Sequence, residues 1–224
     1  MPWPRTLVLV RHAESEGNVL TADQRAEYDI GTHEYALTER GRKQAEITGQ
    51  YLRSAYGVFD ARYVSYYVRS KETMAIMCPN EKVYEDPRLA EAQRGIWHTM
   101  TGEQIALTYP GEVVRKKREG LYHYRPWGGE NWPDVELRVH SFLSTLHRDY
   151  EDKSVVIVVH GHWKILFQRL VDRLSIEEVV RRYDGRDLGG ELANASVTTY
   201  TTDQSSKRPR LTFAGTVVPW EGVI

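Results

Sequence analysis

The chain has 224 residues, of which 41% are hydrophobic and 27% are charged, a composition typical of a folded globular protein. Its formal net charge of −1 excludes an overall basic field that would attract nucleic acid or an acidic membrane. The single cysteine, Cys78, excludes an internal disulfide and a cysteine-rich zinc site. The start of the chain lacks the pattern of a secretory signal, and no stretch reaches the roughly 18 apolar residues of a membrane span. We therefore expect a cytoplasmic protein with neither nucleic acid nor membrane as a partner.

The first predicted element is a strand over residues 6–10, an uninterrupted apolar and β-branched run. A run this short and this apolar indicates a strand buried on both faces, as in parallel sheets covered by helices. Thr38 is the predicted N-cap of a helix that follows. A weaker strand is predicted over residues 63–66, and a helix is predicted to begin near Arg69.

In the second half of the chain, apolar residues recur at spacings of three and four over residues 135–150, which predicts a long amphipathic helix. A second buried strand is predicted over residues 155–159, followed by a helix with apolar positions from Trp163 to Leu174. Residues 196–201 and 211–214 have the pattern of two strands joined by a polar turn. Strand and helix alternate through most of the chain. This predicts a three-layer α/β/α sandwich with a mostly parallel central sheet and one antiparallel edge strand near the carboxyl terminus.

Both apolar runs are followed by polar residues. Arg11 and His12 follow the first run, and His160, Gly161 and His162 follow the second. Ligands of open α/β sheets bind beyond the carboxyl ends of the strands, so neighbouring strands would deliver both histidines to one edge. Either histidine alone is compatible with a structural role, satisfied by nearby carbonyl groups. The pair, together with Arg11, predicts a functional site.

Arg69 and Glu91 fit the same site. An arginine at a helix N-terminus is well placed to bind phosphate, although a surface ion pair is an equally good interpretation of Arg69 alone. Glu91 has aromatic and apolar neighbours in the sequence, which predicts a raised pKa and a role as general acid. Residue type alone does not separate Glu91 from the other carboxylates of the chain.

The segment from Arg11-His12 to Asn18 resembles the Arg-His-Gly signature of the histidine phosphatase superfamily, also called the phosphoglycerate mutase-like family. Further segments resemble the family's other motifs in the same order, namely residues 36–45, 64–73, 88–91, 95–97, 129–131 and 158–162. One such match is weak evidence, whereas the ordered set through most of the chain is specific. We expect a single domain over residues 1–224, with an inserted cap-like segment around residues 92–131.

Two departures from the family pattern are informative. Ala13 stands where the family usually has glycine, and alanine is small enough to be tolerated beside the phosphate. Stretches that mark phosphoglycerate mutases proper are replaced by Val19-Leu20-Thr21 and a longer polar segment up to Gly31. The region of residues 15–29 is more similar to the phosphatase members of the family.

The resemblance implies that His12 is a nucleophile that accepts the phosphoryl group, and that Glu91 protonates the leaving alkoxide. One ring nitrogen of His12 must then be unprotonated, and we expect a backbone carbonyl to bind the other. The reaction that the resemblance implies is metal-independent hydrolysis of small phosphate monoesters through a phosphohistidine, with neither metal nor cofactor. The expected phosphate-binding residues are Arg11, Asn18, Arg69, His160 and Gly161.

Three alternative functions stay open. A mutase would return the phosphoryl group to another hydroxyl, and a non-catalytic protein would bind a phosphorylated ligand in the same pocket. A metal hydrolase is disfavoured because His160 and His162 alternate on an extended chain, so that their side chains point to opposite sides. Trapping a phosphohistidine would exclude pure binding, and a chelator would inactivate only a metal enzyme.

The substrate is less defined. The basic run of residues 115–118 would bind a second anionic group or form a solvated helix face. The carboxy-terminal residues 217–220 would pack on the domain or against a second subunit, which leaves a homodimer open. Aromatic and basic residues predicted to line the pocket mouth or to enter the core are Trp97, His98, Tyr109, Tyr122, His123, Tyr124 and Trp127.

Overall fold

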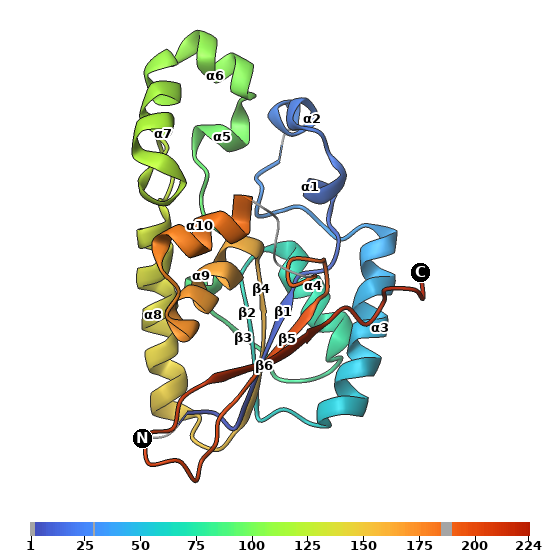
Figure 1. Ribbon diagram of the computed structural model, residues 1–224. Helices are drawn as coiled ribbons and strands as arrows, with labels where there is room; N and C mark the ends of the chain where they lie inside the picture. The colour runs from blue at the N-terminus through green and yellow to red at the C-terminus, as the bar shows by residue number, and fades with distance from the viewer. Residues whose placement is uncertain (1–2, 29, 185–189) are drawn as a thin grey trace.

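The computed structural model describes residues 3–28, 30–184 and 190–224. Residues 1 and 2, which belong to the start of the chain considered above, lie outside the described residues. So does Asp29, the last residue of the region 15–29 that was compared with the phosphatase members of the family. The described residues form a sheet with helices on both faces (Figure 1). This architecture confirms the predicted α/β sandwich.

The described strands form one sheet in the order β3-β2-β4-β1-β5-β6. The first four in this order pair in parallel, β5 is antiparallel to β1, and β6 is antiparallel to β5. The predicted antiparallel part is therefore a pair of strands, and the reversed strand β5 lies one place inside the edge strand β6. The strands are β1 (Thr6–Arg11), β2 (Ala61–Val64), β3 (Tyr84–Glu85), β4 (Ser154–Val159), β5 (Val197–Thr201) and β6 (Thr212–Val217).

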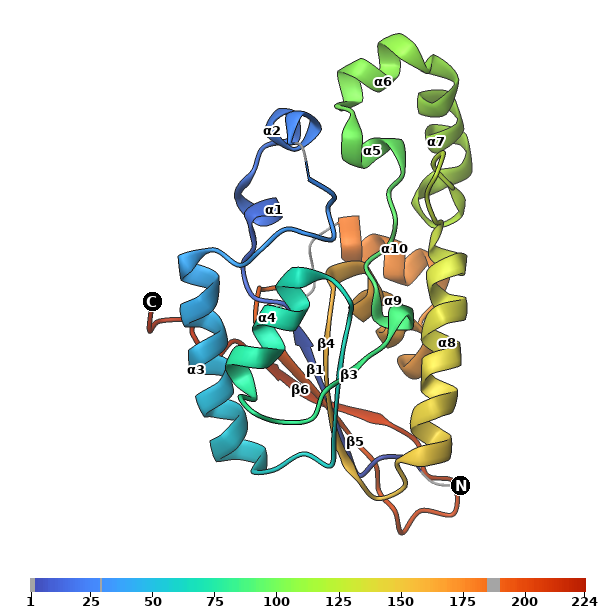
Figure 2. The ribbon, with the colours of Figure 1, turned by 180° about the vertical axis from the view of Figure 1, so that it is seen from behind.

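Helices α3 (Glu39–Tyr56) and α4 (Val68–Met77) cover one face of the sheet (Figures 1 and 2). Helices α8 (Trp132–Asp149), α9 (Gly161–Asp172) and α10 (Ile176–Asp184) cover the other. Successive side chains of a strand point to opposite faces, so β1 contributes to both cores. Leu7 and Leu9 pack in the core under α8 and α9, whereas Val8 and Val10 pack in the core under α3 and α4. This double burial explains the uninterrupted apolar run.

Local sequence signals placed one helix start correctly and misplaced two other element ends. The Thr38 hydroxyl accepts a hydrogen bond of 2.9 Å from the Gly41 amide, which confirms the predicted N-cap of α3. The strand predicted over residues 63–66 is wrong by two residues, because Tyr67 serves as the extended N-cap of α4 and the chain must leave the sheet before it. Helix α9 ends at Asp172 with Arg173 in the left-handed conformation (φ 57°), so Leu174, which the prediction included, lies outside the helix.

The remaining α-helices lie beyond the carboxyl ends of β1, β2 and β4 (Figure 1), whereas the 3-10 helix packs against α8. Among the described helices, none is both long and apolar enough to cross a membrane. Residues 92–131 contain three of the helices, and their assignment as a cap stays a prediction. These elements are α1 (Glu16–Val19), α2 (Ala22–Glu27), the 3-10 helix η1 (Pro87–Leu89), α5 (Ile96–Thr99), α6 (Gly102–Thr108) and α7 (Pro110–His123).

Candidate active site

The register of the sheet brings three strand ends to one edge. Arg11 of β1 is paired with Val159 of β4, and Val64 of β2 is paired with Val158. The residues that follow these strands, His12, His160 and Ser65, therefore emerge side by side. The ring centroids of His12 and His160 are 5.1 Å apart.

The His12 ring is buried and has a defined tautomer. Its Nδ1 lies 2.8 Å from the carbonyl oxygen of Ala13, which can only accept, so Nδ1 carries the proton. The other nitrogen, Nε2, is then unprotonated and accepts a hydrogen bond of 3.2 Å from Nε of Arg69. Burial lowers the pKa of His12 well below 6.5, and the positive charge of Arg69 lowers it further. The ring is neutral at physiological pH.

Arg69 joins the two histidines. It is the second residue of α4 and is 7% exposed. Its Nη2 lies 3.3 Å from Nδ1 of His160, and its Nη1 donates to the carbonyl oxygen of Thr32 at 2.7 Å. The guanidinium is thus oriented by groups from three segments that are distant in sequence.

His160 is fully buried and also neutral. Because a guanidinium can only donate, Nδ1 of His160 accepts from Arg69, and Nε2 donates to the hydroxyls of Ser65 (2.9 Å) and Ser70 (3.3 Å). Burial, followed by the charge of Arg69, lowers the pKa of His160 well below 6.5. In this state its Nδ1 has no proton to donate, so it can hold a phosphate oxygen only after protonation.

Arg11 and Gly161 form the opposite side of the site. Nη1 of Arg11 donates to the carbonyl oxygen of Leu192, whereas its Nε is buried and has no hydrogen-bond partner within the described chain. A Cβ atom at Gly161 would lie 3.9 Å from that Nε and 3.8 Å from Oε2 of Glu91. Gly161 therefore lies between the arginine and the predicted acid.

Glu91 differs from the prediction in its protonation. Its Oε1 accepts a hydrogen bond of 2.9 Å from the Ala92 amide and lies 3.5 Å from Nδ1 of His162. Burial by itself raises the pKa of Glu91, but His162 and then His160 outweigh it and bring the pKa well below 4.5. The expectation of a raised pKa is wrong for the ligand-free protein, because the carboxylate's neighbours are imidazoles and a backbone amide.

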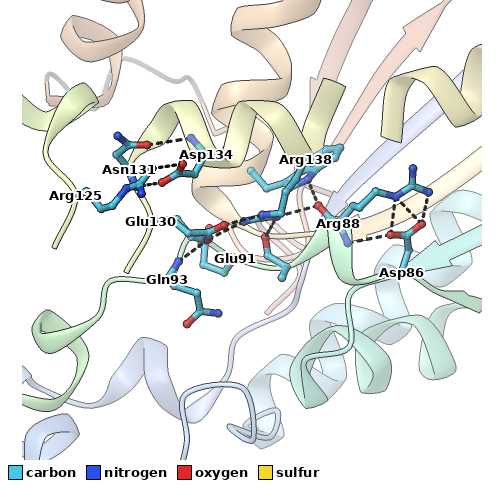
Figure 3. A network of polar contacts seen from close by, with 12 residues as sticks. Asp86, Arg88, Glu91, Gln93, Arg125, Glu130, Asn131, Asp134 and Arg138 are labelled. Atoms are coloured by element: carbon cyan, nitrogen blue, oxygen red, sulfur yellow. Dashed lines mark hydrogen bonds and ion pairs between the residues drawn. The ribbon is translucent and has the colours of Figure 1, made fainter. Parts of the chain in front are cut away.

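Helix α8 fixes the loop that carries Glu91 (Figure 3). Nη1 of Arg138 donates to the carbonyl oxygens of Arg88 (2.9 Å) and Ala90 (3.1 Å), on the chain leading into Glu91. The same guanidinium binds both carboxylate oxygens of Glu130 at 2.8 and 2.9 Å. Glu130 in turn accepts from the Gln93 amide at 3.0 Å. The Glu91 loop is thereby held on both sides of the acid.

Asn18 lies at the outer rim and is exposed. Its Oδ1 accepts from the Ser15 amide at 3.0 Å and from Nδ2 of Asn194 at 3.2 Å. These bonds leave the amide nitrogen of Asn18 available to a ligand. Ala13, which replaces the family's glycine, is buried, and its amide donates to the Thr73 hydroxyl at 3.0 Å.

A pocket of about 310 Å³ adjoins this site between the α2 region and α5. Two of its lining residues contact the site directly: the Thr32 carbonyl binds Arg69, and Gln93 donates to the Tyr67 hydroxyl. The Tyr67 ring lies 4.7 Å from that of His160. The described residues that line the pocket include no carboxylate, and they are Arg25, Ala26, Tyr28, Ile30, Gly31, Thr32, His33, Tyr35, Gln93, Gly95, His98, Thr99 and Gly128.

The aromatic and basic residues that were predicted to line the pocket mouth or to enter the core lie in different places in the structure. His98 lines this pocket, and burial, assisted by Arg94, lowers its pKa to about 4. Tyr122 and Tyr124 are buried in the protein, whereas Trp127 is 54% exposed. In the basic run, Arg115 and Arg118 pair with acidic residues of their own helix, one of which, Glu112, is buried.

Sequence reasoning missed Ser65, Ser70 and the role of His162. His160 and His162 do not alternate on an extended chain, because α9 begins at Gly161 and turns His162 towards Glu91. The hydroxyls of Ser65 and Ser70 flank Arg69 within residues 64–73, the segment that resembled the family, which was the available signal. Within the described ranges, no group of three or more His, Cys, Asp or Glu residues is arranged to hold a metal ion.

Residues 7–212 match the model of the histidine phosphatase superfamily, branch 1. The chain belongs to this superfamily. Phosphoserine phosphatase 1 from Hydrogenobacter thermophilus is 33% identical over 156 residues, which cover 69% of this chain and 70% of the relative. A 2,3-bisphosphoglycerate-dependent phosphoglycerate mutase from Rhizobium etli is 29% identical over 181 residues, 78% of this chain and 84% of the mutase.

Among solved structures of the histidine phosphatase fold, a mycobacterial glucosyl-3-phosphoglycerate phosphatase in complex with VO3 superposes with a TM-score of 0.69 at 25% identity. The match covers 94% of this chain and 98% of that chain. The relatives therefore include both phosphatases and mutases. Membership of the superfamily supports a phosphatase or phosphotransferase.

Proposed function

We propose that this protein hydrolyses phosphate monoesters without a metal ion, through a phosphohistidine formed on His12. The observation that carries the proposal is the state of the His12 ring, whose unprotonated Nε2 faces the buried guanidinium of Arg69. A phosphate monoester carries a charge of about −2 at neutral pH. Arg11 and Arg69 supply two cations to neutralise it, each with a planar fork of donors.

In the first step, Nε2 of His12 attacks the phosphorus in line with the ester oxygen, and the bond from phosphorus to that oxygen breaks. The charge of the transition state is spread over the equatorial oxygens, which fixed guanidinium groups stabilise. In the second step, water attacks the phosphohistidine, the bond from phosphorus to His12 breaks, and inorganic phosphate is released.

Glu91 would donate a proton to the leaving oxygen in the first step and accept one from water in the second. The ionised carboxylate of the free protein must therefore be protonated in the complex. A phosphate dianion next to Glu91 raises the pKa of the carboxyl by like-charge repulsion. The same dianion favours a protonated His160, which then has an Nδ1 proton for a phosphate oxygen, while Asn18 donates through its free amide nitrogen.

The substrate we propose is a small phosphorylated metabolite. Its alcohol portion would occupy the pocket lined by Arg25, His33 and His98, because that pocket adjoins Arg69 and Tyr67. In this arrangement, residues 92–131 act as a cap that supplies Gln93 and His98. Phosphoserine and glucosyl-3-phosphoglycerate, named in the relatives, are the first esters to test.

The variant His12→Ala tests the proposal. We expect it to fold and to lose hydrolysis of p-nitrophenyl phosphate in the presence of a chelator, because the phosphoryl acceptor is gone. Wild-type protein quenched in alkaline denaturant during turnover should carry a phosphoryl label, since phosphohistidine survives base, and His12→Ala should carry none. The matched control is His140→Ala, an exposed histidine of α8. Hydrolysis by His12→Ala at the wild-type rate would refute the assignment.

A mutase is the second candidate, because a phosphoglycerate mutase is among the relatives. It uses the same phosphohistidine and differs only in the acceptor, a hydroxyl in place of water. Phosphate release and phosphoglycerate isomerisation measured on the same preparation separate the two. Isomerisation that is faster than phosphate release would favour the mutase.

A further inference from the structure

A buried lysine lies behind the candidate phosphate site and has no part in the steps above. Lys164 belongs to α9, four residues after His160, and it is 0% exposed. Its Nζ donates to the carbonyl oxygen of Glu191 at 2.7 Å and to the hydroxyl of Ser196 at 3.0 Å. Both partners are uncharged oxygen atoms. These two hydrogen bonds only partly compensate an ammonium group for the hydration that it loses on burial.

The segment that Lys164 binds is the one that holds the site. The carbonyl oxygen of Ser196 accepts from the Arg11 amide at 3.1 Å, and that of Leu192 accepts from the Arg11 guanidinium. The His12 carbonyl oxygen accepts from Nδ2 of Asn194 at 3.1 Å. Lys164 therefore ties together both ends of residues 191–196, whose interior contacts Arg11 and His12.

Electrostatics connect the same groups. Burial lowers the pKa of Lys164 to about 7, Glu191 opposes this effect, and the positive charge of Arg11 adds to it. The amine is thus about half protonated at neutral pH. A dianion bound at Arg11 would favour the ammonium form, because opposite charges attract across a poorly hydrated interior.

We propose that Lys164 is a positioning residue of the phosphate site, which orients Arg11 and His12 through residues 191–196 and adds positive charge when a dianion binds. The inference rests on the proposed function, because it requires that the dianion bind at Arg11. It predicts that dianion binding is accompanied by proton uptake at Lys164.

Inorganic sulfate is a suitable probe, since it stays a dianion between pH 7 and pH 9 while phosphate itself titrates. Above pH 7 the free amine is mostly neutral and must take up a proton on binding, so sulfate affinity should fall as the pH rises. Among the described residues, the charged groups that act on Lys164 are Glu191 and Arg11. In the proposed mechanism a bound dianion also favours protonation of His160 and Glu91, and that proton uptake is common to wild type and the Lys164 variants. The contribution of Lys164 is therefore the difference between them.

The experiment compares sulfate affinity by calorimetry for wild type, Lys164→Met and Lys164→Gln at pH 7, 8 and 9. Lys164→Met should bind sulfate about 10-fold more weakly at pH 7, a loss comparable to the smaller ones seen when an outer-shell group that orients a metal-binding side chain is removed. Its affinity should fall less with rising pH than that of wild type, because proton uptake at Lys164 is lost. Lys164→Gln keeps a donor without the charge, so part of the affinity should return while the pH dependence stays as weak as in Lys164→Met. Lys153→Met, at an exposed residue that precedes β4, should match wild type.

Wild-type affinity and wild-type pH dependence in Lys164→Met would overturn the inference. Should both variants fail to fold, wild-type calorimetry at pH 8 in two buffers of different ionisation heat decides, because the absence of proton uptake contradicts the proposal. A protein that binds sulfate yet hydrolyses no ester would contradict the proposed function alone. Wild-type protein that binds no sulfate would remove the site on which the inference rests.

Discussion

At the scale of single residues, protonation states are set by neighbours. The Ala13 carbonyl decides which nitrogen of His12 is free, and Arg69 keeps that nitrogen unprotonated. Glu91 is the converse case, since His162 holds an ionised carboxylate in surroundings that would otherwise favour the neutral acid. Residue type and sequence neighbours predicted the opposite shift for Glu91, because they do not include a contact with His162.

Glu91→Gln tests the role of the carboxyl as an acid. For an alkyl ester such as phosphoserine, we expect hydrolysis to fall by about 10² to 10⁴, the usual contribution of a positioned general acid. For p-nitrophenyl phosphate the fall should be much smaller, because nitrophenolate leaves without a proton. Steady-state rates for both esters provide the comparison, and Glu103→Gln on exposed α6 is the control. An equal loss for both esters would argue against proton donation by Glu91.

At the scale of elements, two helices position the residues of the candidate site. Helix α9 does so through its N-terminus, and helix α8 does so through a side chain that faces the Glu91 loop. Helix α9 begins directly after His160, which brings Gly161 between Arg11 and Glu91 and directs His162 to the acid. Helix α8 holds the Glu91 loop through Arg138 and Glu130 (Figure 3). The sequence predicted both helices from their apolar periodicity, but periodicity does not tell which loop a polar residue of the helix will bind.

Arg138→Met should destabilise the protein by about 1–3 kcal/mol, because the carbonyl groups of Arg88 and Ala90 and the Glu130 carboxylate lose their donor. Urea unfolding at pH 7 measures this change in free energy. Adding Glu130→Gln to Arg138→Met should recover part of the loss, since the second change removes the unpaired charge. Arg148→Met, at an exposed arginine of the same helix, should leave the stability close to that of wild type. Strictly additive effects at Arg138 and Glu130 would mean that the pair is not coupled.

At the scale of the whole molecule, the candidate site contains basic groups that are buried between the helices on the two faces of the sheet. His12, His160 and Lys164 lie where β1 and β4 leave the sheet, and each has a lowered pKa, caused first by burial. The unfolded chain binds protons at these groups more readily than the folded one. The free energy of unfolding therefore rises with pH wherever these groups lose protons in the unfolded chain.

The free energy of unfolding should fall as the pH is lowered from 7 to 5.5. The pKa values of His12 and His160 in the unfolded chain are near 6.5, whereas the folded values lie well below it. Below pH 6.5 the unfolded state gains protons that the folded state does not, and each histidine contributes a slope of up to about 1.4 kcal/mol per pH unit. Urea unfolding of His160→Asn should show a shallower slope than wild type. An unchanged slope would contradict the neutral, buried state of His160.

The sequence by itself determined the strands β1 and β4, the N-cap of α3, the α/β class and the superfamily. These features depend on local patterns, namely short apolar runs, a capping threonine and motifs in a fixed order. Only the tertiary structure decided the partner of His162, the ionised state of Glu91, the two serines on His160 and the burial of Lys164. Each of these depends on segments that are distant in the chain and adjacent in space, where burial and charge act over a few ångströms regardless of sequence separation.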